Sequence, residues 1–156
     1  MKIKLIALGE KAPDWVNQGA EHYTKRLVGS SIHLEWSLLP IAKRTKSGNI
    51  GLWLGQEAKL IREKLPKESY LVIFDVNAPL LNTEDFANRV SYWQHNHPSI
   101  VFLIGGPNGI DSTIKHLAQE QLSLSKMTFS HTIVQLMVAE QIYRAWSILQ
   151  GHPYHK

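Results

Sequence analysis

The chain has 156 residues, a length typical of one domain with its own core, so we expect a single domain over 1–156. Its net charge of +4 is compatible with an anionic partner such as RNA, although many basic proteins bind no nucleic acid. The lack of cysteine excludes disulfides, thiolate metal sites and cysteine nucleophiles. No apolar run approaches a membrane span, and the first run lacks a signal-peptide pattern, so we expect a cytoplasmic protein.

Strand patterns alternate with helix patterns along the chain. Apolar alternation, or continuous branched and aromatic runs, predicts strands over 2–8, 31–38, 70–76 and 99–104. Apolar residues at helical spacing predict helices over 15–27, 52–65, 83–96, 112–120 and 133–150. The segment 122–129 is either a short strand or an extended loop. This order indicates an α/β fold, with a mainly parallel sheet and helices on both faces.

Particular residues are expected to begin these helices or to orient them. The candidate N-caps are Asp14, Ser112 and Thr132. The first helix has an apolar stripe at i+4 spacing, formed by Trp15, Gly19, Tyr23 and Leu27. The strand over 31–38 has one apolar face, formed by Ile32, Leu34, Trp36 and Leu38. The helix over 52–65 has a charged side that is expected to face solvent, formed by Glu57, Lys59, Arg62, Glu63 and Lys64.

The loop over 40–51 allows two interpretations. It carries three cations, which are Lys43, Arg44 and Lys46. It is either a solvated surface loop or a flexible basic arm that contacts phosphates. Elsewhere, His95 and His97 alternate but have no third candidate ligand nearby, so we expect no metal site.

Three glycines follow the buried strand over 99–104, namely Gly105, Gly106 and Gly109. Glycine lets the backbone turn sharply and approach a ligand closely. The loop is not a Walker loop, because no Gly-Lys-Ser/Thr follows, and its spacing misses the dinucleotide fingerprint. It therefore either only reverses the chain at a sheet edge or approaches a small-molecule cofactor.

Three buried segments end beside small or polar residues, at Phe74-Asp75, at Ile104-Gly105 and over 124–129. In a parallel sheet these ends lie on one rim, where α/β proteins bind ligands. Main-chain groups there can hold an adenine without charged side chains. Asp75 is either a helix cap or hydrogen-bond acceptor for a loop, or it lines a ligand site at the carboxyl end of the strand.

Three motifs, in this order and spacing, give the chain a specific resemblance. They are Leu103-Ile-Gly-Gly-Pro-Asn-Gly109, Leu122-Ser-Leu-Ser-Lys-Met-Thr-Phe129, and Val138-Ala-Glu-Gln-Ile-Tyr-Arg-Ala-Trp146 followed by His152-Pro-Tyr-His155. With Pro13-Asp-Trp15 and the total length, the whole chain resembles the RlmH-type rRNA methyltransferases of the SPOUT class.

The resemblance implies methyl transfer from S-adenosylmethionine to N3 of a pseudouridine in 23S rRNA, within the assembled ribosome. It also implies a homodimer and a deep trefoil knot over about 70–156, which sequence patterns alone would not predict. By position, it assigns the cofactor contacts to Phe74, Gly105, Leu124, Ser125, Lys126, Met127, Thr128 and Phe129. The chain departs from the family pattern at Ser130 and Gln135, where proline and arginine are common, so it lacks a cation for the cofactor carboxylate or a nearby phosphate.

Methylation at N3 of a uracil ring requires removal of the imide proton or stabilisation of the resulting anion, with the donor held in line. It needs no cysteine, unlike methylation of a pyrimidine carbon through a covalent adduct. The last helix has a polar stripe formed by Glu140, Arg144 and Ser147. Arg144 either pairs with Glu140 or, as the resemblance favours, stabilises the substrate anion or a phosphate.

The tail from His152 to Lys156 is richer in ring-bearing residues than an ordinary frayed terminus. We expect Tyr154 and His155 to reach an active site, that of the other subunit of the dimer. Imidazole exchanges protons near neutral pH, so His155 is a candidate base. Tyr154 is a candidate to stack on the target base or orient it. His131 is either a packing residue or part of the site.

Two other functions stay open on the sequence. One is a SPOUT methyltransferase that acts on tRNA or on a ribose oxygen. The other is a non-catalytic ribosome-binding factor that keeps the fold but has no affinity for the cofactor.

Overall fold

The computed structural model describes residues 1–155, so Lys156, the last residue of the predicted tail, lies outside the described part. The strands are β1 Lys2–Leu8, β2 His33–Leu39, β3 Tyr70–Phe74, β4 Ser99–Ile104 and β5 Glu120–Leu122. The helices are α1 Asp14–Arg26, α2 Ile50–Lys64, α3 Thr83–Asn96, α4 Ser112–Lys115, α5 His131–Leu149 and a 3-10 turn over Pro153–His155. Over this range no helix is both long and apolar enough to cross a membrane.

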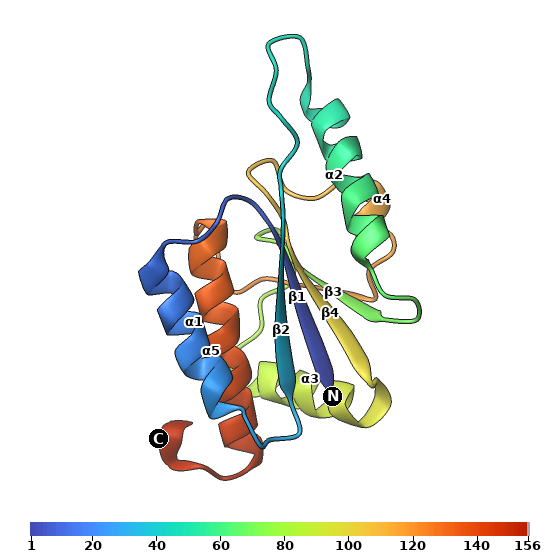
Figure 1. The fold of residues 1–156 in the computed structure, drawn as a ribbon. Helices are drawn as coiled ribbons and strands as arrows, with labels where there is room; N and C mark the ends of the chain where they lie inside the picture. The colour runs from blue at the N-terminus through green and yellow to red at the C-terminus, as the bar shows by residue number, and fades with distance from the viewer. Residues whose placement is uncertain (156) are drawn as a thin grey trace.

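The strands form one parallel sheet in the order β2-β1-β4-β3-β5, with helices on both faces (Figure 1). Helices α1, α3 and α5 cover one face, and α2 and α4 cover the other. Within β4, Ile100, Phe102 and Ile104 face the first layer, while Val101 and Leu103 face the second. This burial on both faces explains the unbroken apolar run. The predicted α/β fold is confirmed.

The predicted apolar stripe of α1 is wrong at its first residue, whereas Tyr23 packs against the core and Leu27 is buried as predicted. Val16 and Ala20 are buried, whereas Trp15 is 60% exposed. Helix α1 packs against α5, and this contact buries the side of α1 that carries Val16 and Ala20. Asp14 lies inside the first turn and is not the cap, because Pro13 precedes it and no side chain caps the helix.

The predicted buried face of the 31–38 strand is confirmed only at its start. Ile32 and Leu34 are buried, but Trp36 and Leu38 are partly exposed. Strand β2 lies at the edge of the sheet and pairs only with β1 among the described residues, so its second half is less covered than a central strand.

The helix predicted over 112–120 is wrong beyond its first turn. Helix α4 ends at Lys115, and the chain then forms β5 against β3. The amide of Gln119 donates to the carbonyl of Leu71 at 3.0 Å, which begins this pairing. Tertiary pairing here overrides the local helical pattern.

Two of the predicted caps are displaced by one or two residues. The side chain of Asp111, not Ser112, caps α4 by accepting from the Thr113 amide. The side chain of Ser130, not Thr132, caps α5.

Glu57 also contradicts its prediction. It was expected on the solvent side of α2, yet only 2% of its surface is exposed. Its carboxylate accepts the Ala42 amide at 2.9 Å and Arg44 Nη1 at 2.8 Å, which explains how a charge is buried here.

Glu120 fixes β5 at the sheet edge. Its carboxylate accepts hydrogen bonds from Tyr70 Oη at 2.6 Å, Trp93 Nε1 at 3.0 Å and the Arg89 guanidinium. Burial raises the pKa of Glu120, but these donors outweigh burial and hold the pKa below its ordinary value of 4.5. Burial, followed by the hydrogen bond to the Glu120 carboxylate, raises the pKa of Tyr70 to about 12.

Glu120→Gln is expected to lower the free energy of unfolding by about 2 kcal/mol at neutral pH, because a charged acceptor of several bonds is lost. A carboxyl with a depressed folded-state pKa contributes stability above its unfolded value, and that contribution is lost as pH falls through the folded pKa. The difference between wild type and variant in urea unfolding should therefore shrink below pH 4.5. A constant difference from pH 7 to pH 3 would contradict this account.

Candidate active site

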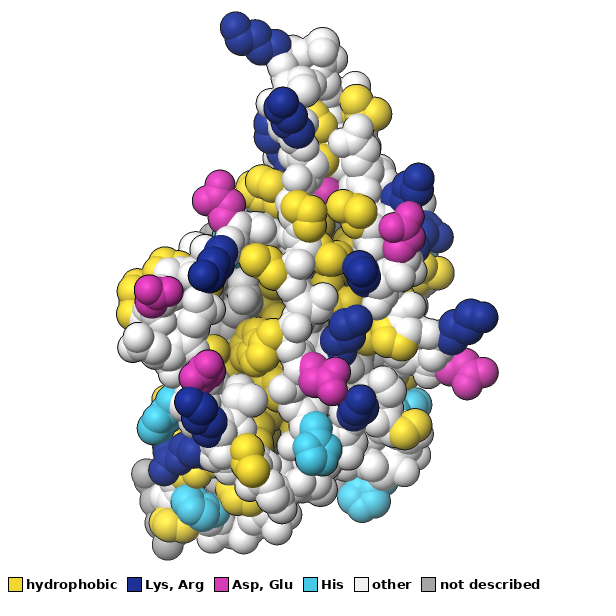
Figure 2. Space-filling model, in the orientation of Figure 1, with side chains coloured by type: hydrophobic (Ala, Val, Ile, Leu, Met, Phe, Trp, Pro, Cys, Tyr) yellow, Lys and Arg dark blue, Asp and Glu magenta, His cyan; other side chains and the backbone are white. Residues whose placement is uncertain are grey.

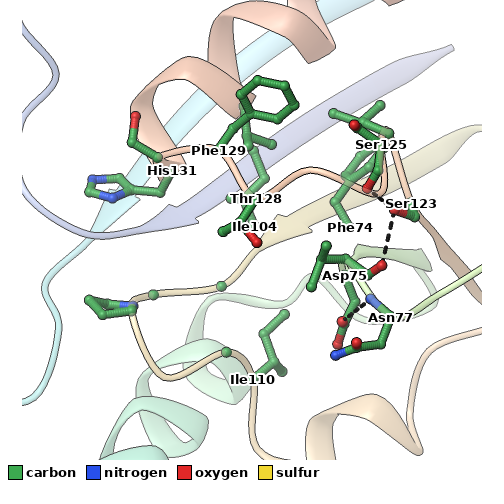
Figure 3. A pocket seen from close by; sticks show the side chains of 18 of the residues that line it. Phe74, Asp75, Asn77, Ile104, Ile110, Ser123, Ser125, Thr128, Phe129 and His131 are labelled. Atoms are coloured by element: carbon green, nitrogen blue, oxygen red, sulfur yellow. Dashed lines mark hydrogen bonds between the residues drawn. The ribbon is translucent and has the colours of Figure 1, made fainter.

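A cavity of about 590 Å³ opens at the carboxyl ends of β3, β4 and β5 (Figure 3). The loops after these strands form its walls, with the first turn of α5 at one side. All of the predicted cofactor residues except Lys126 line it, together with Asp75 and His131. Several other lining residues have no sequence signal that points to them, namely Asn77, Ile110, Lys115 and Val134.

The glycine loop forms one wall of this cavity by close backbone packing. A Cβ on Gly105 would lie 2.7 Å from Ile110 Cγ1 and 2.9 Å from the Gly109 carbonyl oxygen. Gly109 has φ +82° and donates its amide to the Gly106 carbonyl at 3.0 Å, which closes the turn. The glycines therefore do reverse the chain, and they do so at the wall of a ligand-sized cavity.

Asp75 is a hydrogen-bond acceptor for the loop that follows β3, and it also lies at the wall of the cavity. One carboxylate oxygen accepts the Asn77 amide at 2.9 Å, and the other accepts Lys115 Nζ, while the residue lines the cavity. Burial raises the pKa of Asp75, but Lys115 and the Asn77 amide outweigh burial and lower it overall. The side chain is therefore a fixed anion at the cavity wall.

The segment 122–130 forms the opposite wall and is held by its own hydroxyls. Ser123 Oγ donates to the Ser125 carbonyl at 2.9 Å, and Ser125 Oγ accepts the Met127 amide at 2.9 Å. A bridge from Ser123 to Leu80 ties the segment to the loop after β3. These bonds leave the apolar side chains of Leu124 and Phe129 at the cavity.

His131 begins α5 at the edge of the cavity. Its imidazole lies so close to Gly9 that a Cβ there would be 2.2 Å from Nε2. The same Nε2 is 3.4 Å from the Glu10 carbonyl oxygen. His131 therefore both packs on the loop after β1 and lines the cavity.

Gln135, which stands where the family commonly has arginine, is buried in the second turn of α5. Its Nε2 has no hydrogen-bond partner among residues 1–155. Lys115 is the cationic side chain among the described residues that line the cavity.

The three predicted catalytic residues lie away from the cavity within one chain. Arg144 Nε donates to Glu140 at 2.8 Å, and its guanidinium lies 4.7 Å from the Tyr154 ring centroid. Tyr154 Oη donates to Glu140 at 3.1 Å and lies 3.3 Å from Tyr23 Oη. Burial, followed by the contacts with Tyr23 and Glu140, raises the pKa of Tyr154, so its hydroxyl stays protonated at neutral pH.

His155 lies in a second cavity of about 750 Å³ between α1, α5 and the start of α3. Its Nε2 is 3.3 Å from a Glu84 carboxylate oxygen. The two cavities share Phe74, Ser123 and Leu124 in their walls, so the tail is separated from the first cavity by these residues. Within the part of the chain that the structure describes, no group of three or more His, Cys, Asp or Glu side chains could hold a metal ion.

Gly105→Ala is expected to raise the dissociation constant for S-adenosylmethionine at least about tenfold, because an added methyl group would displace Ile110 or the Gly109 backbone. Calorimetry measures this directly. The matched control is Gly55→Ala in α2, where no atom lies within 4 Å of the added Cβ. This control should keep cofactor affinity and gain up to about 1 kcal/mol of stability from helix propensity. Equal cofactor affinities for the two variants would show that the glycine loop is not part of the cofactor site.

A family model described as "Predicted SPOUT methyltransferase" matches residues 1–155. A protein of Francisella philomiragia named "Ribosomal RNA large subunit methyltransferase H" is 54% identical over 156 residues, covering 100% of both chains. A protein of the same name from Francisella tularensis subsp. novicida is 56% identical, again over 100% of both chains. One from Hydrogenovibrio crunogenus is 40% identical over 100% of this chain and 99% of the relative.

The solved structure of a tRNA (m1G37) methyltransferase from Aquifex aeolicus has a similar fold. Its TM-score is 0.57, at 16% sequence identity, over 92% of this chain and 70% of that chain. At this identity the likeness concerns the fold alone. The match of the family model over nearly the whole chain, supported by the full-length relatives, shows that this chain belongs to the SPOUT methyltransferase family.

Proposed function

We propose that this protein transfers a methyl group from S-adenosylmethionine to N3 of a pseudouridine in 23S rRNA of the large ribosomal subunit, in the cytoplasm. The observation that carries the proposal is the cavity at the carboxyl ends of β3, β4 and β5, lined by the predicted cofactor motifs. The names of full-length relatives support the choice of large-subunit rRNA as the substrate.

The cavity fits an adenosine-containing cofactor in size and chemistry. Its volume of about 590 Å³ lies in the usual range for small-molecule sites. Phe74, Ile104, Ile110 and Leu124 offer apolar contacts to a flat ring, and the glycine loop offers main-chain groups. When bound, S-adenosylmethionine supplies an electrophilic methyl group; the residues of this chain bind and orient it.

We assign the contacts with the substrate base to the C-terminal cluster, which consists of Arg144, Tyr154 and His155. Loss of the N3 proton leaves an anion, and Arg144 is a permanent cation that can stabilise it. Tyr154 holds its proton and so acts as a hydrogen-bond donor or stacking surface, not as the base. His155 is the proposed proton acceptor.

We propose that the C-terminal cluster of one subunit completes the cavity of its partner in a homodimer. Two apolar side chains that line the cavity are exposed, with Met127 at 71% and Phe129 at 38%. A dimer interface over this edge would bury them. A site shared between subunits would also explain why Arg144 and the cavity lie apart in one chain.

The chain is proposed to form one domain over 1–156, with a trefoil knot over about 70–156. Membership of the SPOUT family supports the knot.

Two measurements test the function. Calorimetry should detect binding of S-adenosylmethionine, and its absence would favour a non-catalytic ribosome-binding factor. Mass spectrometry of nucleosides from cells that lack the protein should show loss of one N3-methylated pseudouridine from 23S rRNA. Loss of a tRNA modification or of a ribose methyl group instead would reject the proposed substrate.

A further inference from the structure

The segment between β2 and α2 projects away from the sheet as a finger, which we define as residues 40–49 (Figure 1). Lys and Arg side chains gather at the far end of this projection (Figure 2). Lys43 and Lys46 are exposed, and neither takes part in an ion pair among residues 1–155. They are therefore available to an anionic partner.

The finger is held at its base by Glu57, which is buried. One Glu57 oxygen accepts both the Ala42 amide at 2.9 Å and Arg44 Nη1 at 2.8 Å. The Arg44 guanidinium lies 4.9 Å from the Trp53 ring centroid. Arg44 is thereby used to anchor the finger, which leaves the two exposed lysines as its free cations.

The far side of the finger is also packed onto α2. A Cβ on Gly48 would lie 2.5 Å from Trp53 Nε1, so the end of the finger next to α2 packs directly on the indole. Asn49 then caps α2 by accepting the Leu52 amide at 2.9 Å. A loop fixed at both ends loses less conformational entropy when it binds than a free loop does.

The Glu57 carboxylate also lies against the wall of the cofactor cavity. The second oxygen of Glu57 has no partner among the described residues and would lie 3.9 Å from a Cβ on Gly106. Ile41, at the base of the finger, would lie 3.1 Å from that Cβ. The direction of the finger is therefore set by contacts that also touch the glycine loop.

We propose that the finger is a phosphate-binding arm for the RNA substrate, in which Lys43 and Lys46 contact phosphates and Glu57 is a positioning residue. Glu57 fixes the direction of the finger relative to the cavity, so that bound RNA is presented in one register. This inference rests on the proposed function, because it takes large-subunit rRNA as the partner.

The first test compares Lys43→Ala/Lys46→Ala with a control of equal charge, Lys64→Ala/Lys67→Ala, at the other end of α2, about 20 Å away along a helix of this length. Methylation of large subunits is measured at several KCl concentrations. The finger variant should raise KM roughly tenfold and reduce the slope of log KM against log salt by about two, since each phosphate contact contributes about one unit. The turnover number and the cofactor dissociation constant should stay as in wild type.

The second test combines Glu57→Gln with the two lysine substitutions. If Glu57 positions the lysines, Glu57→Gln raises KM by itself, and adding the lysine substitutions raises it little further. Simple loss of stability would instead give additive effects and a lowered melting temperature. Should Glu57→Gln not fold, the lysine comparison still decides the role of the finger.

The outcomes separate the two proposals. If the wild type methylates rRNA but the finger and control variants have the same KM and salt slope, the finger proposal alone is wrong. If the wild type neither binds S-adenosylmethionine nor methylates rRNA, the proposed function is wrong, and the finger proposal, which depends on it, is wrong as well.

Discussion

Arg144→Ala is expected to lower the turnover number for rRNA methylation by about a hundredfold or more, which is the usual effect of removing one group that stabilises a developing anion. The protein should still fold, because the lost pair with Glu140 is a partly exposed i,i+4 pair on one helix. Cofactor affinity should stay unchanged, since Arg144 does not line the cavity of its own chain. Single-turnover methylation and calorimetry measure these two quantities. Near-normal turnover would reject the role.

Glu140→Gln is the control for Arg144→Ala. It weakens the ion pair and the acceptor of Tyr154 but leaves the guanidinium in place. If Arg144 acts on the substrate, Glu140→Gln should keep at least about a tenth of the activity. If both variants lose activity equally, Arg144 serves instead to hold Tyr154 and the tail.

Deletion of Pro153 to Lys156 is the second change with a large expected effect. It should lower turnover by about a hundredfold or more, because it removes the proposed proton acceptor His155 and the phenol of Tyr154. The fold and the dimer should persist, which size-exclusion chromatography and thermal unfolding measure. Full activity of the truncated protein would show that the tail has no part in catalysis.

Two point variants separate the contributions of Tyr154 and His155 to the effect of the deletion. Tyr154→Phe keeps the ring, which lies 4.8 Å from that of Tyr143, and removes only the hydroxyl. His155→Ala removes only the proposed proton acceptor. If His155 accepts the N3 proton, its removal should cost more at pH 7 than at pH 9, where solvent base partly replaces it.

Mixing of variants tests whether the tail acts on the partner subunit. Subunits with Arg144→Ala keep an intact cavity, and subunits with Gly105→Ala keep an intact C-terminal cluster. At an S-adenosylmethionine concentration well below the dissociation constant of the Gly105→Ala cavity, and if sites are shared, randomly mixed dimers should recover about a quarter of wild-type activity, because half of the dimers are mixed and each has one complete site. If each site lies within one chain, mixing should restore no activity.

The local sequence pattern was sufficient to predict the central strands, the α3 helix and the motifs proposed for the cofactor. The run over 99–104 is apolar at every position after the first, and only a strand covered on both faces requires this. The helix Thr83–Asn96 has the predicted bounds, because its capping residue and its apolar spacing agree. The motifs at Gly105 and over 124–129 were assigned to one site by resemblance, and they do line one cavity.

What the sequence by itself determined, then, is most of the alternation of strands and helices and, through the resemblance, the family and several of the residues that line the cavity. Tertiary structure alone decided that Glu57 is buried, that the chain after Lys115 forms a strand, and that Arg144 lies apart from the cavity in one chain. Each of these depends on a partner distant in sequence: Ala42 and Arg44 for Glu57, and β3 for β5. Helical spacing and composition describe only near neighbours, so they cannot report a contact that folding creates.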